Sequence, residues 1–490
     1  MTITTQTPAR DETLSQKQLV GGEWVDAASG EWIEVENPAR RTTIGWVPRS
    51  TEDDVNAAVA AAKGAFPAWR AMPARERGAL LVMIGNRIDE NKEELAKIIA
   101  SETGNALRTQ ARGEAASAAE LFRYYGSTSS EQKGETLPLG ENLLSYTIRE
   151  PLGVVGGIVP WNAPVQLATL KIAMALSTGN TIVLKAAELA PLGVLRLAEI
   201  ASEFLPAGVL NVLTGTGHAV GAPLSKHPDV AKLTFTGSTG VGKSILAAAA
   251  DRIVPVTLEL GGKSPVIVFP DSDDDATVDG VIAGMRFTRQ GQSCTAGSRL
   301  YLHRDIYDSF LQKLAAKLQQ LVIGDPLDEA TDMGAMISQN QYDTVIRYIK
   351  SGQERGGEII IGGVPEGNGS DGLYIEPTVI SGVSEGWEVT REEIFGPVLV
   401  VLPWDDEEEV LRQANDSHYG LAGYVWCKDI STALRTAHRL ESGWIQVNRG
   451  LGQLPGMAYG GIKQSGLGRE HSMEGALDSF TVRKSITVAI

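Results

Sequence analysis

The sequence predicts an α/β protein with two large lobes and a small β arm. With 490 residues, the chain exceeds what one hydrophobic core usually serves, so at least two lobes are expected. From about residue 150 onward, short apolar runs alternate with helical patterns, and the runs fall into two separate series. Strands that are apolar on both faces and separated by single helices are typical of parallel sheets covered by helices on both sides.

The first series of apolar runs lies before residue 262. A doubly wound sheet of this kind is the architecture that hosts nucleotides. We therefore expect a Rossmann-like dinucleotide-binding domain made of residues 1–130 and 150–260. Its expected strands are 153–160, 180–187, 208–215, 232–237 and 256–262.

The part of the chain before residue 130 is predicted to be mostly helical. Thr51 and Asp54 have the spacing of a capping box and precede the helical pattern VNAAVAAAKGAF. A longer amphipathic helix is expected over about 75–97. These helices would pack on the first sheet.

The second series of apolar runs predicts a second α/β domain over residues 261–470. The boundary is expected near Gly261 and Gly262, so a ligand bound between the domains would meet residues from both. A helical segment at 305–320 is one of those that separate the runs. The expected strands are 264–270, 299–304, 358–363, 397–404, 423–427 and 443–448.

Residues 131–149 and 471–490 alternate polar with apolar side chains and look like strands without a local partner. Strand edges of this kind often pair across subunits. We therefore expect a small β oligomerisation arm from these two segments.

Composition excludes several classes of function. The 60 acidic and 44 basic side chains give a net charge of −16, which repels nucleic acid. No run approaches the roughly 20 apolar residues of a membrane-spanning helix. The first twenty residues lack the apolar centre of a secretory signal, and the two cysteines, Cys294 and Cys427, are too few for a disulfide framework. A cytoplasmic protein is expected.

Residues 237–244, GSTGVGKS, match the P-loop pattern and lie between an expected strand and an expected helix. With the later run VIVFPDSDDD as a Mg²⁺-binding strand, they allow a P-loop ATPase. Against this, the motif follows the fourth expected strand rather than the first, and Pro270 interrupts the supposed Mg²⁺ strand. A glycine-rich turn that merely begins a helix is a second interpretation. In a third, N–H groups at the helix start bind a dinucleotide pyrophosphate together with Ser238.

Four short segments carry a resemblance to a known family. They are PWNAP at 160–164, LELGGK at 258–263, GQSC at 291–294 and EIFGP at 393–397. Their types, order and separations resemble those of the aldehyde dehydrogenase superfamily, in its hydrolytic, NAD(P)-dependent branch. The resemblance runs from residues 21–39 to residues 460–470. It implies that residues 261–470 form the catalytic domain.

The chemistry of such an enzyme explains the residue types. Cys294 would attack the aldehyde carbon, and nearby dipoles and a cation could hold it as the reactive thiolate. The oxygen of the resulting thiohemiacetal would accept hydrogen bonds from the Asn162 amide and the Cys294 N–H. Hydride transfer to nicotinamide would leave a thioester, which Glu259 would help water to hydrolyse. By the resemblance, Lys171 and Glu470 relay the proton away from Glu259. Cys427 lies in an apolar run and is interpreted as a core residue.

NAD is the expected cofactor, and no metal is expected. Glu188 would accept hydrogen bonds from the adenosine ribose and repel a 2′-phosphate, so NADP is the less favoured alternative. Ala186 stands where the family often has proline. The resemblance places the cofactor against Trp161, Lys185, Glu188, Gly217, Gly221, Gly237, Ser238, Leu260, Glu393 and Phe395.

The substrate is expected to be a bulky aldehyde, aromatic or terpenoid-like. Positions that usually hold aromatic rings in short-chain members are Ala163, Leu170, Gly284 and Thr288, which leaves more room. A semialdehyde acid is the alternative, because an arginine pointing into the tunnel would bind a carboxylate. The far end of the aldehyde is expected near Gln453 and Tyr459. The candidate arginines are Arg286, Arg289 and Arg449.

The resemblance also implies assembly, because the family pairs subunits through these arm segments. A homodimer or homotetramer is expected. Two other classes of protein remain open: the P-loop ATPase, and a catalytically silent protein that keeps the dehydrogenase fold. The ATPase leaves Cys294, Glu259 and Asn162 without a role, and a silent descendant would be expected to have lost at least one of them.

Overall fold

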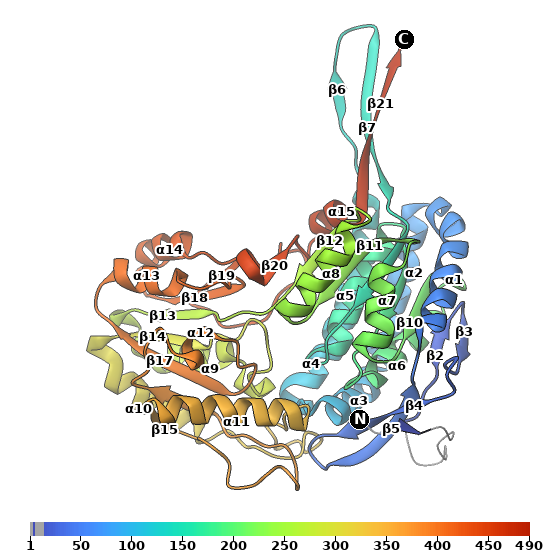
Figure 1. Cartoon of the computed structure of the whole chain (residues 1–490). Helices are drawn as coiled ribbons and strands as arrows, with labels where there is room; N and C mark the ends of the chain where they lie inside the picture. Colours follow the sequence, from blue (N-terminus) through green and yellow to red (C-terminus); the bar gives the residue numbers. More distant parts are fainter. Residues whose placement is uncertain (1–2, 5–13) are drawn as a thin grey trace.

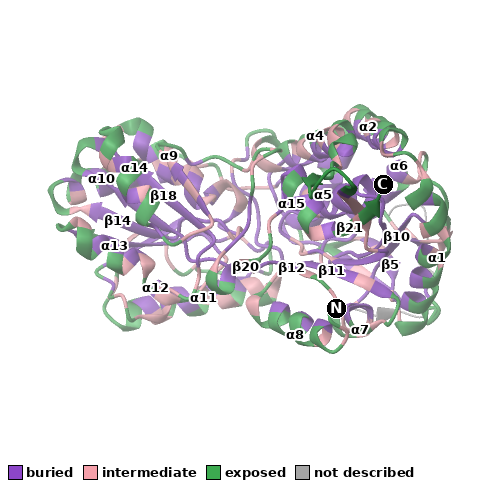
Figure 2. Cartoon of the chain, turned by 90° about the horizontal axis from the view of Figure 1, so that it is seen from above, coloured by how far each residue is buried: buried purple, intermediate pink, exposed green. Residues whose placement is uncertain are grey.

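The computed structural model describes residues 3–4 and 14–490. Two α/β lobes lie side by side, and a narrow three-stranded arm projects from one of them (Figure 1). Seen from above, each lobe has buried strands at its centre and partly exposed helices around them (Figure 2). The predicted class, a Rossmann-like lobe with a second α/β lobe and a β arm, is confirmed. Residues 1–2 and 5–13, part of the stretch in which no secretory signal is expected, lie outside the described residues.

In spatial order, the strands of the first sheet are β20 (Gly466–Leu467), β12 (Val256–Glu259), β11 (Val230–Thr236), β8 (Val154–Ile158), β9 (Thr181–Lys185), β10 (Leu210–Leu213), β2 (Gln18–Val20) and β3 (Glu23–Val25). The five strands from β12 to β10 run parallel. The chain runs outward from β8 to β10 and then returns to the other side of β8 to form β11. The topological switch point therefore lies between β8 and β11, where ligands of such sheets bind.

Two groups of helices cover this first sheet and bury its apolar faces. On one face lie α2 (Ala74–Glu90), α3 (Lys92–Thr103), α4 (Arg112–Thr128), α5 (Pro164–Ser177) and α6 (Leu192–Ser202). On the other lie α1 (Glu52–Ala71), α7 (Ala222–Lys226) and α8 (Thr239–Ala250).

The predicted capping box is confirmed, since Thr51 and Asp54 close it at the start of α1. The prediction of one helix over 75–97 is wrong. Asn91 separates α2 from α3, because its side-chain amide donates to the Arg87 carbonyl and competes with the helical pattern. The N-terminal part is also less helical than expected. Besides β2 and β3, a small separate sheet forms from β1 (Ile3–Thr4), β4 (Trp32–Asn37) and β5 (Thr42–Pro48).

In spatial order, the strands of the second sheet are β15 (Glu358–Ile361), β16 (Thr378–Ser381), β17 (Val398–Trp404), β14 (Arg299–His303), β13 (Pro265–Val268), β18 (Ala422–Trp426) and β19 (Trp444–Val447). All run parallel except β15. The sequence predicts each of these strands except β16. The helices of this lobe are α9 (Asp275–Met285), α10 (Tyr307–Leu318), α11 (Gln339–Glu354), α12 (Glu388–Arg391), α13 (Glu407–Asn415) and α14 (Ile430–Arg439).

The arm consists of β6 (Thr136–Pro138), β7 (Leu143–Pro151) and β21 (Thr481–Ala489). The expectation that residues 131–149 lack a local partner is wrong, because β6 and β7 pair antiparallel within this segment. β7 and β21 pair antiparallel over nine residues each, although more than 300 residues separate them in sequence. Residues expected as strand from 471 onward begin instead with helix α15 (Met473–Phe480).

The fold excludes the interpretation as a P-loop ATPase. GSTGVGKS follows β11 and forms the start of α8 in the first lobe, whereas the supposed Mg²⁺-binding strand is β13 in the second sheet. The Asp271 carboxylate after β13 accepts from the N–H groups of Lys428 and Asp429 and so closes a turn. In residues 3–4 and 14–490, no helix is long and apolar enough to cross a membrane.

Candidate active site

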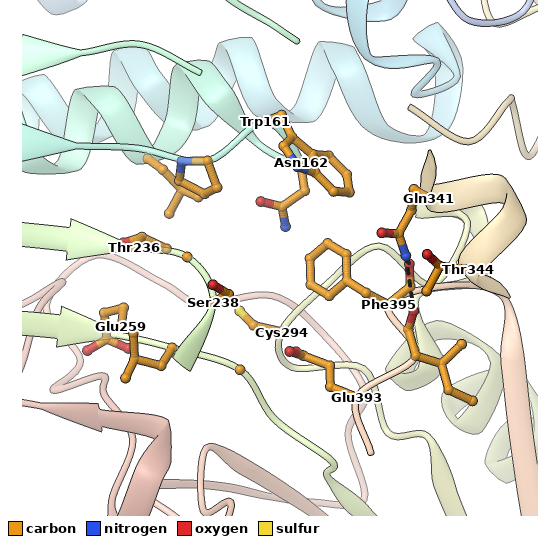
Figure 3. A pocket seen from close by; sticks show the side chains of 16 residues that line it. Trp161, Asn162, Thr236, Ser238, Glu259, Cys294, Gln341, Thr344, Glu393 and Phe395 are labelled. Atoms are coloured by element: carbon orange, nitrogen blue, oxygen red, sulfur yellow. Dashed lines mark hydrogen bonds between the residues drawn. The ribbon is translucent and has the colours of Figure 1, made fainter. Parts of the chain in front are cut away.

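A cavity of about 320 Å³ lies where the loops after β8, β11 and β12 face the second lobe (Figure 3). Its position coincides with the switch point of the first sheet. Residues predicted independently from separate motifs meet in its walls. These residues are Trp161, Asn162, Gly237, Ser238, Glu259, Leu260, Cys294, Glu393 and Phe395.

Cys294 lies in the loop before β14, and its side chain is half-buried at the cavity. Two glycines allow the surrounding chain segments to approach closely. A Cβ on Gly262 would lie 2.4 Å from the Cys294 carbonyl oxygen, and one on Gly291 would lie 2.0 Å from the Gly396 carbonyl oxygen. Gly291 also has φ of +63°, a conformation that favours glycine. The GG and GQSC motifs therefore fix the place of the thiol.

The thiol is not held as a thiolate, so that prediction is wrong. Burial raises the pKa of Cys294 to about 12, and the Glu393 carboxylate adds to the rise. In Figure 3 the Glu393 carboxylate points toward Cys294. The hydroxyl of Tyr459, 3.8 Å from the sulfur, acts in the opposite direction and lowers the pKa. Desolvation and the carboxylate outweigh this hydrogen bond, so Cys294 carries its proton at neutral pH.

Asn162 follows β8 and points into the cavity toward Cys294 (Figure 3). Its side-chain amide donates to the Gln292 carbonyl at 2.9 Å. Its own carbonyl accepts from the Asn105 amide at 3.1 Å, within buried surroundings. An amide nitrogen has two N–H groups, so one remains to donate to an oxygen that develops negative charge beside Cys294.

Glu259 is the last residue of β12 and is buried. Neither carboxyl oxygen has a hydrogen-bond partner in the described part of the chain. Burial raises its pKa well above the usual range, and the nearby Glu470 carboxylate raises it further. In Figure 3 the carboxyl group is turned away from Cys294. A buried carboxyl with a raised pKa is the type of group that serves as a general base near neutral pH.

Lys171 and Glu470 form a fully buried ion pair next to Glu259. The Lys171 Nζ lies 2.8 Å from a Glu470 carboxylate oxygen, and both side chains are at most 1% exposed. The Thr234 hydroxyl donates to the same oxygen at 3.3 Å. Both charged groups influence the pKa of Glu259, so the pair lies within electrostatic reach of it.

The start of α8 supplies groups suited to a pyrophosphate. Ser238 caps the helix, and its side chain accepts from the Val241 N–H at 3.4 Å. Gly237 and Leu260 lie on the same wall of the cavity. The Lys243 side chain of the P-loop pattern lies at an exposed position. The N–H groups of a first helical turn and the helix dipole favour an anion at such a terminus.

A second group of predicted cofactor residues lies at the end of β9, outside the cavity that contains Cys294. Lys185 Nζ lies 3.0 Å from a carboxylate oxygen of Glu188. The Gly217 N–H also donates to Glu188, and a Cβ on Gly221 would lie 3.5 Å from the Lys185 side chain. These four residues therefore form one cluster.

The remaining wall is aromatic and comes from both lobes. The rings of Trp161 and Phe395 meet edge to face, with centroids 5.3 Å apart. Phe395 has φ of +55°. Gln341, at the start of α11, holds this segment by donating to the carbonyls of Ile394 and Phe395, both at 3.0 Å. Gln341 could not be predicted from the sequence, because no local motif marks an amide whose partners are backbone atoms 53 and 54 residues away.

The predicted substrate residues, unlike the predicted catalytic residues around Cys294, do not gather around the cavity. None of Ala163, Leu170 and Thr288 lines the cavity, whereas Leu167, which was not predicted, does. A Cβ on Gly284 would contact the Tyr424 ring at 3.6 Å, so this glycine packs against β18. Tyr459 was expected near the far end of the aldehyde. Its hydroxyl instead contacts Cys294.

The three candidate arginines differ in their partners. Arg286 donates to the Leu451 carbonyl at 2.7 Å, and Arg289 donates to the Gln110 side chain at 3.0 Å. Arg449 is exposed. Cys427 is buried in a hydrophobic core of the second lobe, in agreement with its interpretation as a core residue.

A thiol, an amide and a buried carboxyl grouped at the switch point of a Rossmann-like sheet are typical of a dehydrogenase that works through a cysteine. A family model described as "Aldehyde dehydrogenase family" matches residues 24–486. The chain therefore belongs to the aldehyde dehydrogenase family, and it is an enzyme of that family.

Its relatives are similar over their whole lengths. The chain is 41% identical to a phenylacetaldehyde dehydrogenase of Pseudomonas fluorescens, covering 100% of this chain and 99% of the relative. It is 40% identical to a hydroxyisobutyraldehyde dehydrogenase of Mycolicibacterium austroafricanum, covering 100% and 97%. Among solved structures, an NAD⁺ complex of an aldehyde dehydrogenase from Bacillus cereus matches with a TM-score of 0.94 and 38% identity, covering 97% of each chain.

Proposed function

We propose that the enzyme oxidises an aldehyde to the carboxylic acid with NAD⁺, through a thioester on Cys294. The observation that carries this proposal is the meeting of Cys294, Asn162 and Glu259 around one cavity, beside a helix N-terminus suited to a pyrophosphate. In this proposal, residues 1–130 and 150–260 bind the dinucleotide, and residues 261–470 form the catalytic domain.

Each residue has a defined task. Cys294 releases its proton to solvent, and its sulfur bonds to the aldehyde carbon as the C=O π bond breaks to give an oxyanion. The Asn162 amide and the Cys294 N–H donate to this oxyanion; one such donor is typically worth about 3 kcal/mol. Glu259 then turns toward the cavity, takes a proton from water and so drives hydrolysis of the thioester. The Lys171–Glu470 pair receives that proton, because it lies beside Glu259 in the same buried region.

The residues present fit a dinucleotide. The α8 N-terminus with Ser238 would hold its pyrophosphate, and Glu188 would accept from its adenosine ribose hydroxyls. Glu393 would hold the second ribose, and Trp161 and Phe395 would bound the nicotinamide ring. When bound, NAD⁺ supplies the acceptor for the electrons removed from the aldehyde carbon. The similar Bacillus cereus enzyme has been solved as an NAD⁺ complex.

For the substrate, we propose a bulky aldehyde that carries an aromatic group. Positions that usually hold aromatic rings in short-chain members carry the smaller residues Ala163 and Thr288 here, although neither residue lines the cavity around Cys294. A relative at 41% identity is named for phenylacetaldehyde, an aromatic aldehyde. A semialdehyde acid is disfavoured, because Arg286 and Arg289 donate to other protein groups and Arg449 is exposed.

We also propose that the chain forms a homodimer or homotetramer through the arm. Its strands expose apolar side chains to solvent, and a second copy of the chain would cover them. These exposed side chains are Leu137, Leu139, Leu143, Leu144, Val482 and Val488.

The first test measures NADH formation by absorbance with a short aliphatic, an aromatic and a carboxylate-bearing aldehyde. We expect the aromatic aldehyde to give the highest kcat/KM, and Cys294→Ala to abolish the reaction while the protein remains folded. Cys427→Ala is the matched control and should keep the rate, since Cys427 lies in the second core. Full activity in Cys294→Ala would refute the thioester. A faster reaction with the short aldehyde would refute only the substrate class.

Cofactor choice gives a second prediction. Glu188→Gln should raise the ratio of kcat/KM with NADP⁺ to that with NAD⁺ by about tenfold, because the carboxylate that repels a 2′-phosphate is gone and Lys185 loses its ionic partner. Initial rates with both cofactors measure this ratio. Glu199→Gln, an exposed position on α6, serves as the control and should leave the ratio unchanged. An unchanged ratio in Glu188→Gln would remove this residue from cofactor selection.

A further inference from the structure

The Tyr459 hydroxyl lies 3.8 Å from the sulfur of Cys294, although 165 residues separate the two in sequence. We propose that Tyr459 is a further catalytic residue, whose hydroxyl donates a hydrogen bond to the Cys294 sulfur and stabilises its thiolate. This inference rests on the proposed function, because it concerns the same thiol. It assigns to Tyr459 a contact with the reacting atom rather than with the distant end of the substrate.

The ring of Tyr459 is fixed from several sides. It meets the Trp444 ring edge to face at 5.7 Å and the His471 ring at 5.3 Å. Its backbone exchanges two hydrogen bonds with Glu470, of 3.0 and 2.7 Å. The residue is only 5% exposed. A donor held in this way needs little reorganisation when charge develops on the sulfur, so it stabilises that charge more than a mobile water does.

The pKa of the Tyr459 phenol shows which of the two groups donates this hydrogen bond when Cys294 is ionised. Burial raises the pKa of Tyr459 well above its usual value, so the phenol stays protonated when Cys294 ionises. The side chain of Gln453 also hydrogen-bonds to Tyr459 and orients its hydroxyl. Once the thiol has lost its proton, the sulfur can only accept, and the Tyr459 O–H is the donor.

The charges around the sulfur make such a donor necessary. Glu393 and Glu259 both oppose ionisation of Cys294. Arg289 interacts with Cys294 electrostatically and favours the thiolate, but its own guanidinium is desolvated. An uncharged donor in contact with the sulfur acts against the two carboxylates without a further buried charge.

The hydroxyl of a second tyrosine near the thiol, Tyr424, already donates a hydrogen bond to another group. The Tyr424 hydroxyl donates to the Thr295 carbonyl at 2.8 Å. Its single proton is therefore used, and it does not replace the hydroxyl of Tyr459. Tyr459→Phe should accordingly remove the contact while keeping the packing of the ring.

The test is the pH dependence of alkylation of Cys294 by iodoacetamide, in wild type and in Tyr459→Phe. Cys294→Ser gives the background from Cys427. We expect the variant to react about three- to tenfold more slowly between about pH 7 and 9, because a rise of about one pH unit in the pKa lowers the thiolate fraction about tenfold and the more basic thiolate recovers part of that loss. A general loosening of the site would instead hydrate the thiol and speed alkylation.

The matched control is Tyr342→Phe, which removes a hydroxyl bonded to the Gly367 carbonyl in the second lobe. Its alkylation rate at each pH should equal that of wild type. An equal or higher rate in Tyr459→Phe would overturn the inference. Alkylation requires neither aldehyde nor cofactor, so the two proposals fail separately. Slower alkylation of Tyr459→Phe in a protein that oxidises no aldehyde would sink the proposed function alone, and an unchanged alkylation rate in an active enzyme would sink the role of Tyr459 alone.

Discussion

Glu259→Gln is expected to stop the enzyme at the thioester. The variant keeps Cys294 and Asn162, so acylation should proceed and release about one NADH per active site. Turnover after this burst should fall by about 10²–10⁴-fold, the usual contribution of a general base. Rapid-mixing absorbance measures the burst, and mass spectrometry measures the acyl group on Cys294.

The pH dependence of the wild-type enzyme should report the same group. Burial places the pKa of Glu259 well above its usual range, so the carboxyl is protonated at low pH and becomes a base only as the pH rises. The hydrolysis rate should therefore increase with pH through the titration of Glu259, and Glu259→Gln should lack this increase.

Glu102→Gln provides the control for this experiment. Glu102 is also buried, and burial raises its pKa to about 8, but its carboxylate accepts from the Leu192 and Gly193 N–H groups at the start of α6. Its side chain takes no part in the cavity, so steady turnover without a burst is expected. If Glu259→Gln hydrolysed the thioester at the wild-type rate, another group would have to be the base.

Sequence patterns predict a strand well when all of its residues are buried to the same degree. β9 reads TIVLK and is buried at every position, so an apolar run marks it clearly. β3 reads EWV and is partly exposed throughout, so no periodicity separates it from a loop. The pairing of β7 with β21 leaves no local sign either, because the two strands lie more than 300 residues apart in the sequence.

Some features of the site can likewise be predicted from the sequence, and others cannot. Motifs identify Cys294 and Glu259, because glycines and a nucleophile at fixed spacing are visible in sequence. The ionisation state of Cys294 is not visible, because it depends on desolvation by both lobes and on Glu393, about 100 residues away. The contact from Tyr459 depends on the edge-to-face contacts of its ring with Trp444 and His471, which only the folded chain brings together.

Glu470→Gln is expected to destabilise the protein strongly. It leaves the Lys171 ammonium buried without its counterion, at a site where both side chains are at most 1% exposed. Breaking a buried pair in this way costs about 3–5 kcal/mol, because the remaining charge lacks both water and a partner. Chemical denaturation monitored by circular dichroism measures the free energy of unfolding.

Two further variants separate this effect from general disturbance. Asp405→Asn breaks the exposed pair with Arg304, whose side chains are 61% and 59% exposed, and should cost no more than about 1 kcal/mol. Lys171→Met combined with Glu470→Gln removes both charges and should recover much of the lost stability, because no unpaired charge remains buried. The double variant should nevertheless hydrolyse the thioester slowly, since the proton from Glu259 has lost its acceptor. Recovery of both stability and rate would show that the pair serves the fold alone.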